Sequence, residues 1–405
     1  MVEFHLSRNV RTDALTDPRA DHPPNHLGEV TTASHGVGKL EHGLYNTTVL
    51  DSGIVVDTGV SNKGAAMPPT AVRATSALRA IARQRTVRIT AAIWFAANAL
   101  VLLLAEDALP FDWPELPGSS VEHVLNTNIA LLGIFGLMAL TCLLTRNRAR
   151  PDLAERAPDL ATARREVAFL LTYGVLGLVL GFGLARLLGW HPFGLHLAGT
   201  IFGTHEHVGP AEAISWAAYN LLVYAVVPLA YFRRRYSAVQ LNLVSSDRRS
   251  DARLIVIILL VESTIQFATL ATVVGELSAR QYVVGLPVTF VLYLAGAVLP
   301  AMVFIYCILV PRFLRLTGSA ATTVILGGVT YTLLHVWDAW TVLTSPTDAL
   351  LSIVFLFFTY FGPGMMKTVL TVRTGNAWTH VWAYHALAPH TLIDTPHVVE
   401  IFKLR

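Results

Sequence analysis

Residues 283–310, VVGLPVTFVLYLAGAVLPAMVFIYCILV, contain no charged side chain. About 20 apolar residues in a helix are enough to cross the hydrocarbon core of a bilayer, so this stretch predicts a transmembrane helix. Only helices and closed barrels satisfy their backbone hydrogen bonds in lipid, and runs of this length fit helices. Similar runs recur along the chain from Arg83 onward. The sequence therefore predicts an all-α, polytopic transmembrane bundle of eight or nine helices, with spans at 89–106, 126–145, 167–189, 212–232, 253–275, 283–310, 320–343 and 348–372, and the aromatic, histidine-rich stretch 376–394 as the ninth.

The composition excludes several other classes of protein. Of the 405 residues, 53% are hydrophobic and 14% are charged, and the mean hydropathy is +0.52. Soluble globular proteins contain about 25% charged residues, so an ordinary cytosolic enzyme is excluded. So much apolar surface also excludes a largely disordered chain. The two cysteines, Cys142 and Cys307, lie in apolar runs, which argues against a disulfide scaffold.

The charge pattern predicts orientation rather than nucleic-acid binding. The formal net charge is +3, and the arginines form clusters beside alternate apolar runs. Positively charged loops remain on the cytoplasmic side of a membrane. We therefore expect an integral protein of the bacterial plasma membrane, surrounded by lipid, with a cytoplasmic N-terminus and no nucleic-acid partner. The chain divides into a polar, weakly structured tail (1–82), N-terminal transmembrane helices (83–211) and a C-terminal transmembrane core (212–405).

Four ionisable residues inside the predicted spans are candidates for a site. Glu262 is followed one helical turn later by Gln266, and Asp338 follows His335 at a spacing that places both on one helix face. His385 lies in the last stretch. Ionisable residues within a membrane are costly and usually mark function, so we favour a functional role for His335.

Other polar residues have simpler interpretations. Lys367 is expected to extend its ammonium group to the cytoplasmic interface. His380 and His390 could lie at the interface beside neighbouring tryptophans, and Glu262 could be protonated and hydrogen-bonded to another helix. The segment His205-Glu206-His207 falls in a loop and is expected to be solvated.

Two histidine motifs in residues 212–393 resemble the CPBP family, the CAAX-protease and bacteriocin-processing intramembrane proteases. The segment Tyr331-Thr-Leu-Leu-His335 fits the family's aromatic-x-x-x-His motif. The segment Thr374-Gly-Asn-Ala-Trp378 then leads to His385, as a Thr-Gly-x-x-Trp segment leads to a second histidine in the family. This resemblance implies hydrolysis of a peptide bond at the membrane, in a transmembrane or lipidated peptide and without a cofactor.

The chain departs from the family at the motif Glu-Glu-x-x-x-Arg, where Ala301-Met302 and Tyr306 stand. It also has Pro389 four positions after His385, where the family has Asn or a similar polar residue. The resemblance implies a glutamate that activates water beside two histidines.

We therefore expect another carboxylate to replace the missing glutamates. Glu262 is the first candidate and Asp338 the second. The hypothesis is that Glu262, His335 and His385 converge in one cavity.

Three alternatives remain open. The chain could be a catalytically inactive relative that binds a transmembrane partner or peptide. It could be a membrane metalloenzyme, because His335, Asp338, His380, His385 and His390 are ligand types that suit zinc or iron. Residues five apart on an α-helix are separated by about 500° of rotation, so the last three histidines are not expected to share a face. A transporter with a proton relay is the third alternative. The sequence does not indicate an oligomeric state.

Overall fold

The computed structural model describes residues 79–105, 109–111, 119–200, 206–274 and 277–404. All described residues belong to one compact unit, which lies within Val49–Arg405. Most of the predicted polar tail (1–82) therefore lies outside the described residues. Residues 79–82, at the end of that tail, are helical.

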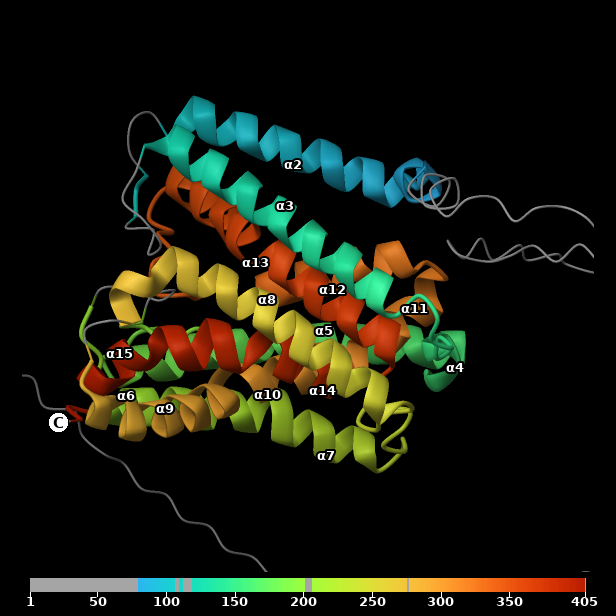
Figure 1. Ribbon diagram of the computed structural model, residues 1–405. Coiled ribbons are helices and arrows are strands. Elements are labelled where there is room, and N and C mark those ends of the chain that lie inside the picture. The colour runs from blue at the N-terminus through green and yellow to red at the C-terminus, as the bar shows by residue number, and fades with distance from the viewer. Residues whose placement is uncertain (1–78, 106–108, 112–118, 201–205, 275–276, 405) are drawn as a thin grey trace, which may run out of the picture. The chain divides into compact units, whose positions relative to one another are not determined.

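All regular secondary structure in the described part of the chain is helical (Figure 1). Six helices are long and apolar enough to cross a membrane. Each corresponds to a predicted span. They are α2 (Arg85–Leu104), α3 (Ser120–Leu144), α5 (Leu160–Leu187), the continuous Pro210–Arg233 and Ala279–Thr317, and α13 (Pro346–Thr374).

The two continuous helices contain π-helical turns beside prolines. In Pro210–Arg233, α6 (Pro210–Asn220) passes through η1 (Leu221–Val226) into α7 (Val227–Arg233), with Pro228 at the junction. Ala279–Thr317 is composed of α9 (Ala279–Tyr293), η2 (Leu294–Val298), α10 (Leu299–Ala301), η3 (Met302–Leu309) and α11 (Val310–Thr317). Proline has no N–H to donate, and a wider π-turn accommodates the missing bond without ending the helix.

Three further helical regions complete the described bundle. They are α8 (Arg248–Val274), α12 (Ala320–Leu333) and a C-terminal region made of α14 (Trp378–His380), η4 (Val381–His385), η5 (Leu387–Leu392) and α15 (Ile393–Ile401). A short helix, α4 (Leu153–Arg156), precedes α5. The predicted span 320–343 is wrong in its second half, because α12 ends at Leu333 and turns follow.

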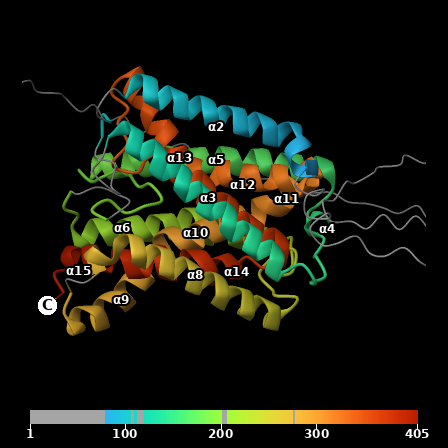
Figure 2. The same ribbon diagram turned by 45° about the horizontal axis from the view of Figure 1, so that its top comes forward.

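Burial increases towards the C-terminal half of the chain. In the most apolar 18-residue stretch of α2, only 6% is buried within the protein. The corresponding share is 67% in both Ala279–Thr317 and α13. Both views show α2 and α3 side by side (Figures 1 and 2), and their exposed faces carry apolar side chains such as Phe95 and Leu132. The interior polar residues therefore gather around α13 and its neighbours.

Candidate metal centre

His335 lies in a turn just after α12. Its Nδ1 is 2.7 Å from the backbone oxygen of Tyr331, so Nδ1 carries the proton and donates it there. The other ring nitrogen, Nε2, is buried and has no hydrogen-bond partner in the described structure. A backbone carbonyl that fixes one nitrogen of a histidine leaves the lone pair of the other available to a ligand. His335 is therefore prepared to bind an electrophile.

Asp338 follows His335 by one tight turn rather than along a helix face. The amide of Asp338 donates to the carbonyl oxygen of His335 at 2.9 Å. Its side chain is buried, and Oδ2 accepts a 2.6 Å hydrogen bond from the hydroxyl of Tyr360 on α13. The predicted proximity of His335 and Asp338 arises from this turn, which replaces the helical geometry that their spacing suggested.

His196 is the third member of the cluster, and sequence reasoning missed it. It lies between α5 and α6, in a stretch where Phe193, Leu195 and Leu197 are buried. Its Nδ1 is 3.2 Å from Oδ2 of Asp338. The available signal was the alternation of apolar residues in HPFGLHL, which is unusual for a solvated loop.

Gly194 allows this segment to approach Asp338. Its carbonyl oxygen accepts hydrogen bonds from the indole of Trp216 and the amide of Asn220, both at 2.9 Å. A Cβ atom at this position would lie 2.6 Å from Oδ1 of Asp338. Any larger residue at position 194 would displace Asp338. Glycine therefore allows the segment that carries His196 to pack against Asp338.

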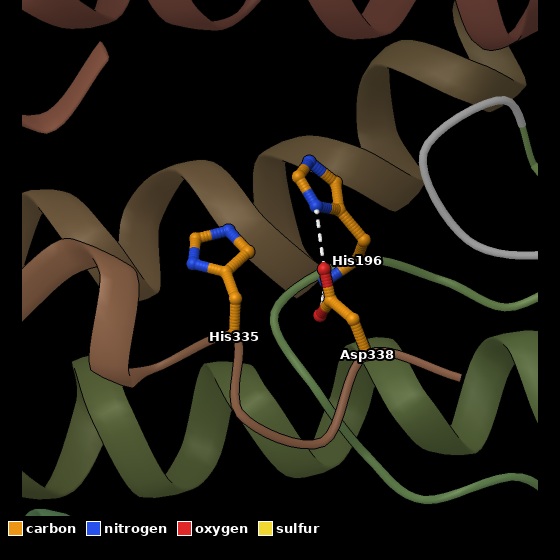
Figure 3. Close-up of side chains that lie close together, drawn as sticks. All are labelled: His196, His335 and Asp338. Atoms are coloured by element: carbon orange, nitrogen blue, oxygen red, sulfur yellow. Dashed lines mark hydrogen bonds and ion pairs between the residues drawn. The ribbon is translucent and has the colours of Figure 1, made fainter. Parts of the chain in front are cut away.

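The three buried side chains lie close together, and a hydrogen bond joins His196 to Asp338 (Figure 3). Each of His196, His335 and Asp338 offers one ligand atom, and these atoms lie within 4.8 Å of one another. The two imidazole centroids are 4.8 Å apart. Tyr360 stacks on His335 with a centroid distance of 3.8 Å and an interplanar angle of 19°. Two imidazoles and one carboxylate form a ligand set that zinc and ferrous iron accept.

Three histidines of the C-terminal region, His380, His385 and His390, form a row, and the last of them lies beside His196. The ring centroids of His380 and His385 are 5.9 Å apart, those of His385 and His390 are 5.1 Å apart, and His390 is 5.2 Å from His196. The expectation that residues five apart would not share a face is wrong here. The segment is π-helical, and its i→i+5 hydrogen bonds bring such residues onto nearly the same side.

His385 and His335 meet through Tyr331 rather than directly. The Tyr331 hydroxyl is 3.2 Å from Nε2 of His385, and its backbone oxygen accepts the proton of His335. His390 pairs with Asp394, whose Oδ2 is 3.4 Å from its Nδ1.

Glu262 belongs to a neighbouring polar group. Its carboxylate accepts a 3.0 Å hydrogen bond from Gln266 and interacts electrostatically with Lys367. No hydrogen bond or ion pair joins it to His335 or His385 among the described residues. Lys367 is buried rather than extended to the interface, and its Nζ lies 3.7 Å from the ring centroid of Tyr331. The structure thus places Asp338, and not Glu262, beside His335.

His191 anchors the start of the segment that carries His196. Its Nδ1 is 2.8 Å from Glu212, and its Nε2 is 2.5 Å from Glu206. Burial lowers the pKa of His191, but the hydrogen bonds and charges of the two carboxylates outweigh it, so the net pKa lies above the ordinary 6.5. Glu206, which was expected only to be solvated, therefore helps to hold the segment in place.

Comparison of the chain with protein-family models, with curated proteins and with solved structures finds no match. The function of the chain is therefore inferred from the geometry of the buried cluster.

Proposed function

We propose that this chain is a membrane-embedded, metal-dependent hydrolase that binds a zinc-like divalent cation through His196, His335 and Asp338. The observation that carries the proposal is the convergence of three buried ligand atoms within 4.8 Å. The simpler interpretations of a single buried histidine do not explain two imidazoles and a carboxylate whose ligand atoms lie within 4.8 Å of one another.

The surroundings of the cluster support a cation as its occupant. A buried nitrogen without a partner costs about 1–3 kcal/mol, so the bare Nε2 of His335 calls for a ligand. The 3.2 Å separation of His196 Nδ1 and Asp338 Oδ2 is close to the roughly 3.3 Å between two ligands of one tetrahedral zinc ion. The Tyr331 carbonyl and the Tyr360 hydroxyl orient His335 and Asp338, as outer partners do in metal sites.

These residues define roles in hydrolysis. His196, His335 and Asp338 would hold the ion, which when bound would supply a water with a pKa near 7 as the nucleophile. Tyr360 holds Asp338 in place and closes one side of His335. His390, paired with Asp394 and next to His196, is placed to move a proton at the edge of the cluster.

The resemblance to CPBP proteases supports a peptide bond as the substrate, in a transmembrane or lipidated peptide. The arginine clusters support a cytoplasmic N-terminus in a bacterial plasma membrane. A bundle of eight or nine spanning helices is part of this proposal, in which α8, α12 and the C-terminal region join the six long apolar helices. The cluster lies just after the C-terminal end of α12, whereas Arg315 lies shortly before the N-terminal end of this helix. Because arginine favours the cytoplasmic side, this arrangement supports a cluster on the non-cytoplasmic side.

Metal analysis of the purified full-length protein tests the proposal. We expect about one zinc ion per chain after purification and dialysis, and its loss in His335→Ala. The control is His207→Ala, whose side chain is 89% exposed and lies outside the cluster. Absence of metal from the wild-type protein, even after zinc is added in excess, would contradict the proposal.

A metal-free peptidase at the same residues is the second candidate. The hydrogen bonds of Asp338 to Tyr360 and His196 favour it, because they would orient a carboxylate that accepts a proton from water. Chelator-resistant cleavage of a membrane peptide that requires Asp338 would select this candidate. Full function in His335→Ala would instead favour an inactive, peptide-binding relative.

A further inference from the structure

A hollow lies where α8 begins and α3 ends. None of the residues that line it belongs to the histidine cluster. Its volume is about 360 Å³, which is within the range of small-ligand sites. The residues that line it are Leu144 on α3, Asp247 just before α8, and Arg249, Ser250, Arg253 and Leu254 on the first turns of α8.

Two arginines against one carboxylate give the lining of the hollow a net positive charge. Arg249 and Arg253 are exposed and form no ion pair within the described structure. The neighbouring Asp251 is not available to them, because it is buried and bound to Arg148 and to the Asn376 amide. Asp247 caps the helix by accepting the amide proton of Ser250 at 3.0 Å. The hollow therefore offers two guanidinium groups and one capping carboxylate.

The remaining walls are apolar and continue into the exposed surface of the bundle. Leu144 and Leu254 line the hollow itself. Leu143 is 55% exposed at the end of α3, and Val256 and Leu260 are 54% and 62% exposed further along α8. Exposed leucines and valines on an apolar spanning helix face acyl chains. The hollow therefore combines two guanidinium groups with apolar helix faces, as a site at a membrane interface requires.

We propose that this hollow binds the phosphate of an anionic phospholipid, with its acyl chains along the exposed face of α3 and α8. Arginine binds phosphate through paired, charge-assisted hydrogen bonds. Basic pockets between transmembrane helices bind anionic headgroups in the same way. The phosphate replaces the missing counter-charge of Arg249 and Arg253, and the apolar walls select a lipid over a soluble phosphate.

Native mass spectrometry of the full-length protein in detergent tests the proposal, with phosphatidylglycerol, phosphatidylcholine or inorganic phosphate added. We expect phosphatidylglycerol to remain bound to the wild-type protein. The double variant Arg249→Gln/Arg253→Gln should bind it about 10- to 30-fold more weakly, given the contribution of each arginine near an anionic surface. The matched control is Arg234→Gln/Arg315→Gln, which removes the same charge from two exposed arginines that do not line the hollow.

The possible results separate the sources of the anion. Equal weakening in both double variants would show that only net charge matters and would overturn the site. Equal retention of phosphatidylcholine, or retention of inorganic phosphate in place of the lipid, would overturn the assignment of an anionic lipid. Thermal unfolding in lipid-free detergent should be the same for both double variants, since all four side chains are exposed, and this verifies that the fold is intact.

Discussion

Two of the buried polar clusters among the described residues each contain a carboxylate, and their surroundings differ in kind. In the first, Glu166 on α5 binds Arg312 on α11 at 2.6 Å, and Tyr236 donates to its other oxygen at 2.7 Å. In the second, Asp338 has a tyrosine and an imidazole as partners, and the Nε2 of His335 beside it has none.

The contrast shows that burial of an ionisable group does not by itself identify a functional site. The guanidinium of Arg312 also lies over the rings of Phe232 and Tyr236, so the first cluster brings its own counter-charge and packing. Such a pair holds two helices together. The histidine cluster instead brings three ligand atoms within 4.8 Å of one another, and no arginine or lysine of the described residues forms an ion pair with Asp338.

The largest effect is expected from Arg312→Ala, which removes one partner of the buried pair. The remaining Glu166 would be a buried charge without a counter-ion, a change that costs about 3–5 kcal/mol of stability. Unfolding of the purified protein in a denaturing detergent series measures it. Arg315→Ala, an exposed site on the same helix, should change stability by less than about 0.5 kcal/mol. Similar losses in the two variants would show that the pair is not structural.

The two candidate carboxylates can be separated by their effect on metal binding. We expect Asp338→Asn to weaken zinc binding at least about 100-fold, because a ligand is lost, and outer-shell changes alone reach about 10- to 100-fold. Glu262→Gln should change the zinc affinity by no more than about threefold, because Glu262 is hydrogen-bonded to Gln266 in a separate polar cluster. Competition with a zinc-binding dye measures both. A larger loss in Glu262→Gln than in Asp338→Asn would reverse the assignment made here.

The close packing of Gly194 predicts a smaller, local effect. In Gly194→Ala the new methyl group would lie 2.6 Å from Oδ1 of Asp338 and 2.9 Å from its backbone nitrogen. Displacement of this kind costs about 1–3 kcal/mol and should also weaken metal binding. Gly183→Ala on α5 has open space around the new atom and should stabilise its helix by about 0.5–1 kcal/mol. Thermal unfolding with opposite signs for the two variants is the expected result.

The smallest effect is a pH dependence at His191, which is faced by Glu206 and Glu212. Because its pKa is raised in the folded state, its stabilising contribution is complete below about pH 6.5 and is lost as the pH rises through the raised value. The difference in unfolding temperature between the wild type and His191→Gln should therefore shrink between pH 6 and pH 9. Solvent screens this partly exposed group, so at most about 1 kcal/mol is involved.

The control for this profile is His207→Gln. His207 lies 3.3 Å from Glu400 in a pair whose side chains are 89% and 64% exposed. Its substitution should give a flat difference over the same range. A flat profile for His191→Gln as well would remove the anchoring role of the two carboxylates.

The sequence by itself determined the helical class and the six apolar spans, and it predicted that His335 and Asp338 lie close together. Apolar length is a local property, and the low charge of the chain leaves little choice but burial in lipid. The spacing of three between His335 and Asp338 also kept them close, although a turn rather than a helix joins them.

Only the tertiary structure decided which residues complete the cluster. His196 comes from a segment more than a hundred residues away, and its position depends on Trp216, Asn220 and the absence of a side chain at Gly194. The alignment of His380, His385 and His390 depends on π-helical turns, which the α-helical period does not predict. Contacts between distant segments are set by packing and not by local spacing, and for this reason the sequence favoured Glu262 where the fold brought Asp338.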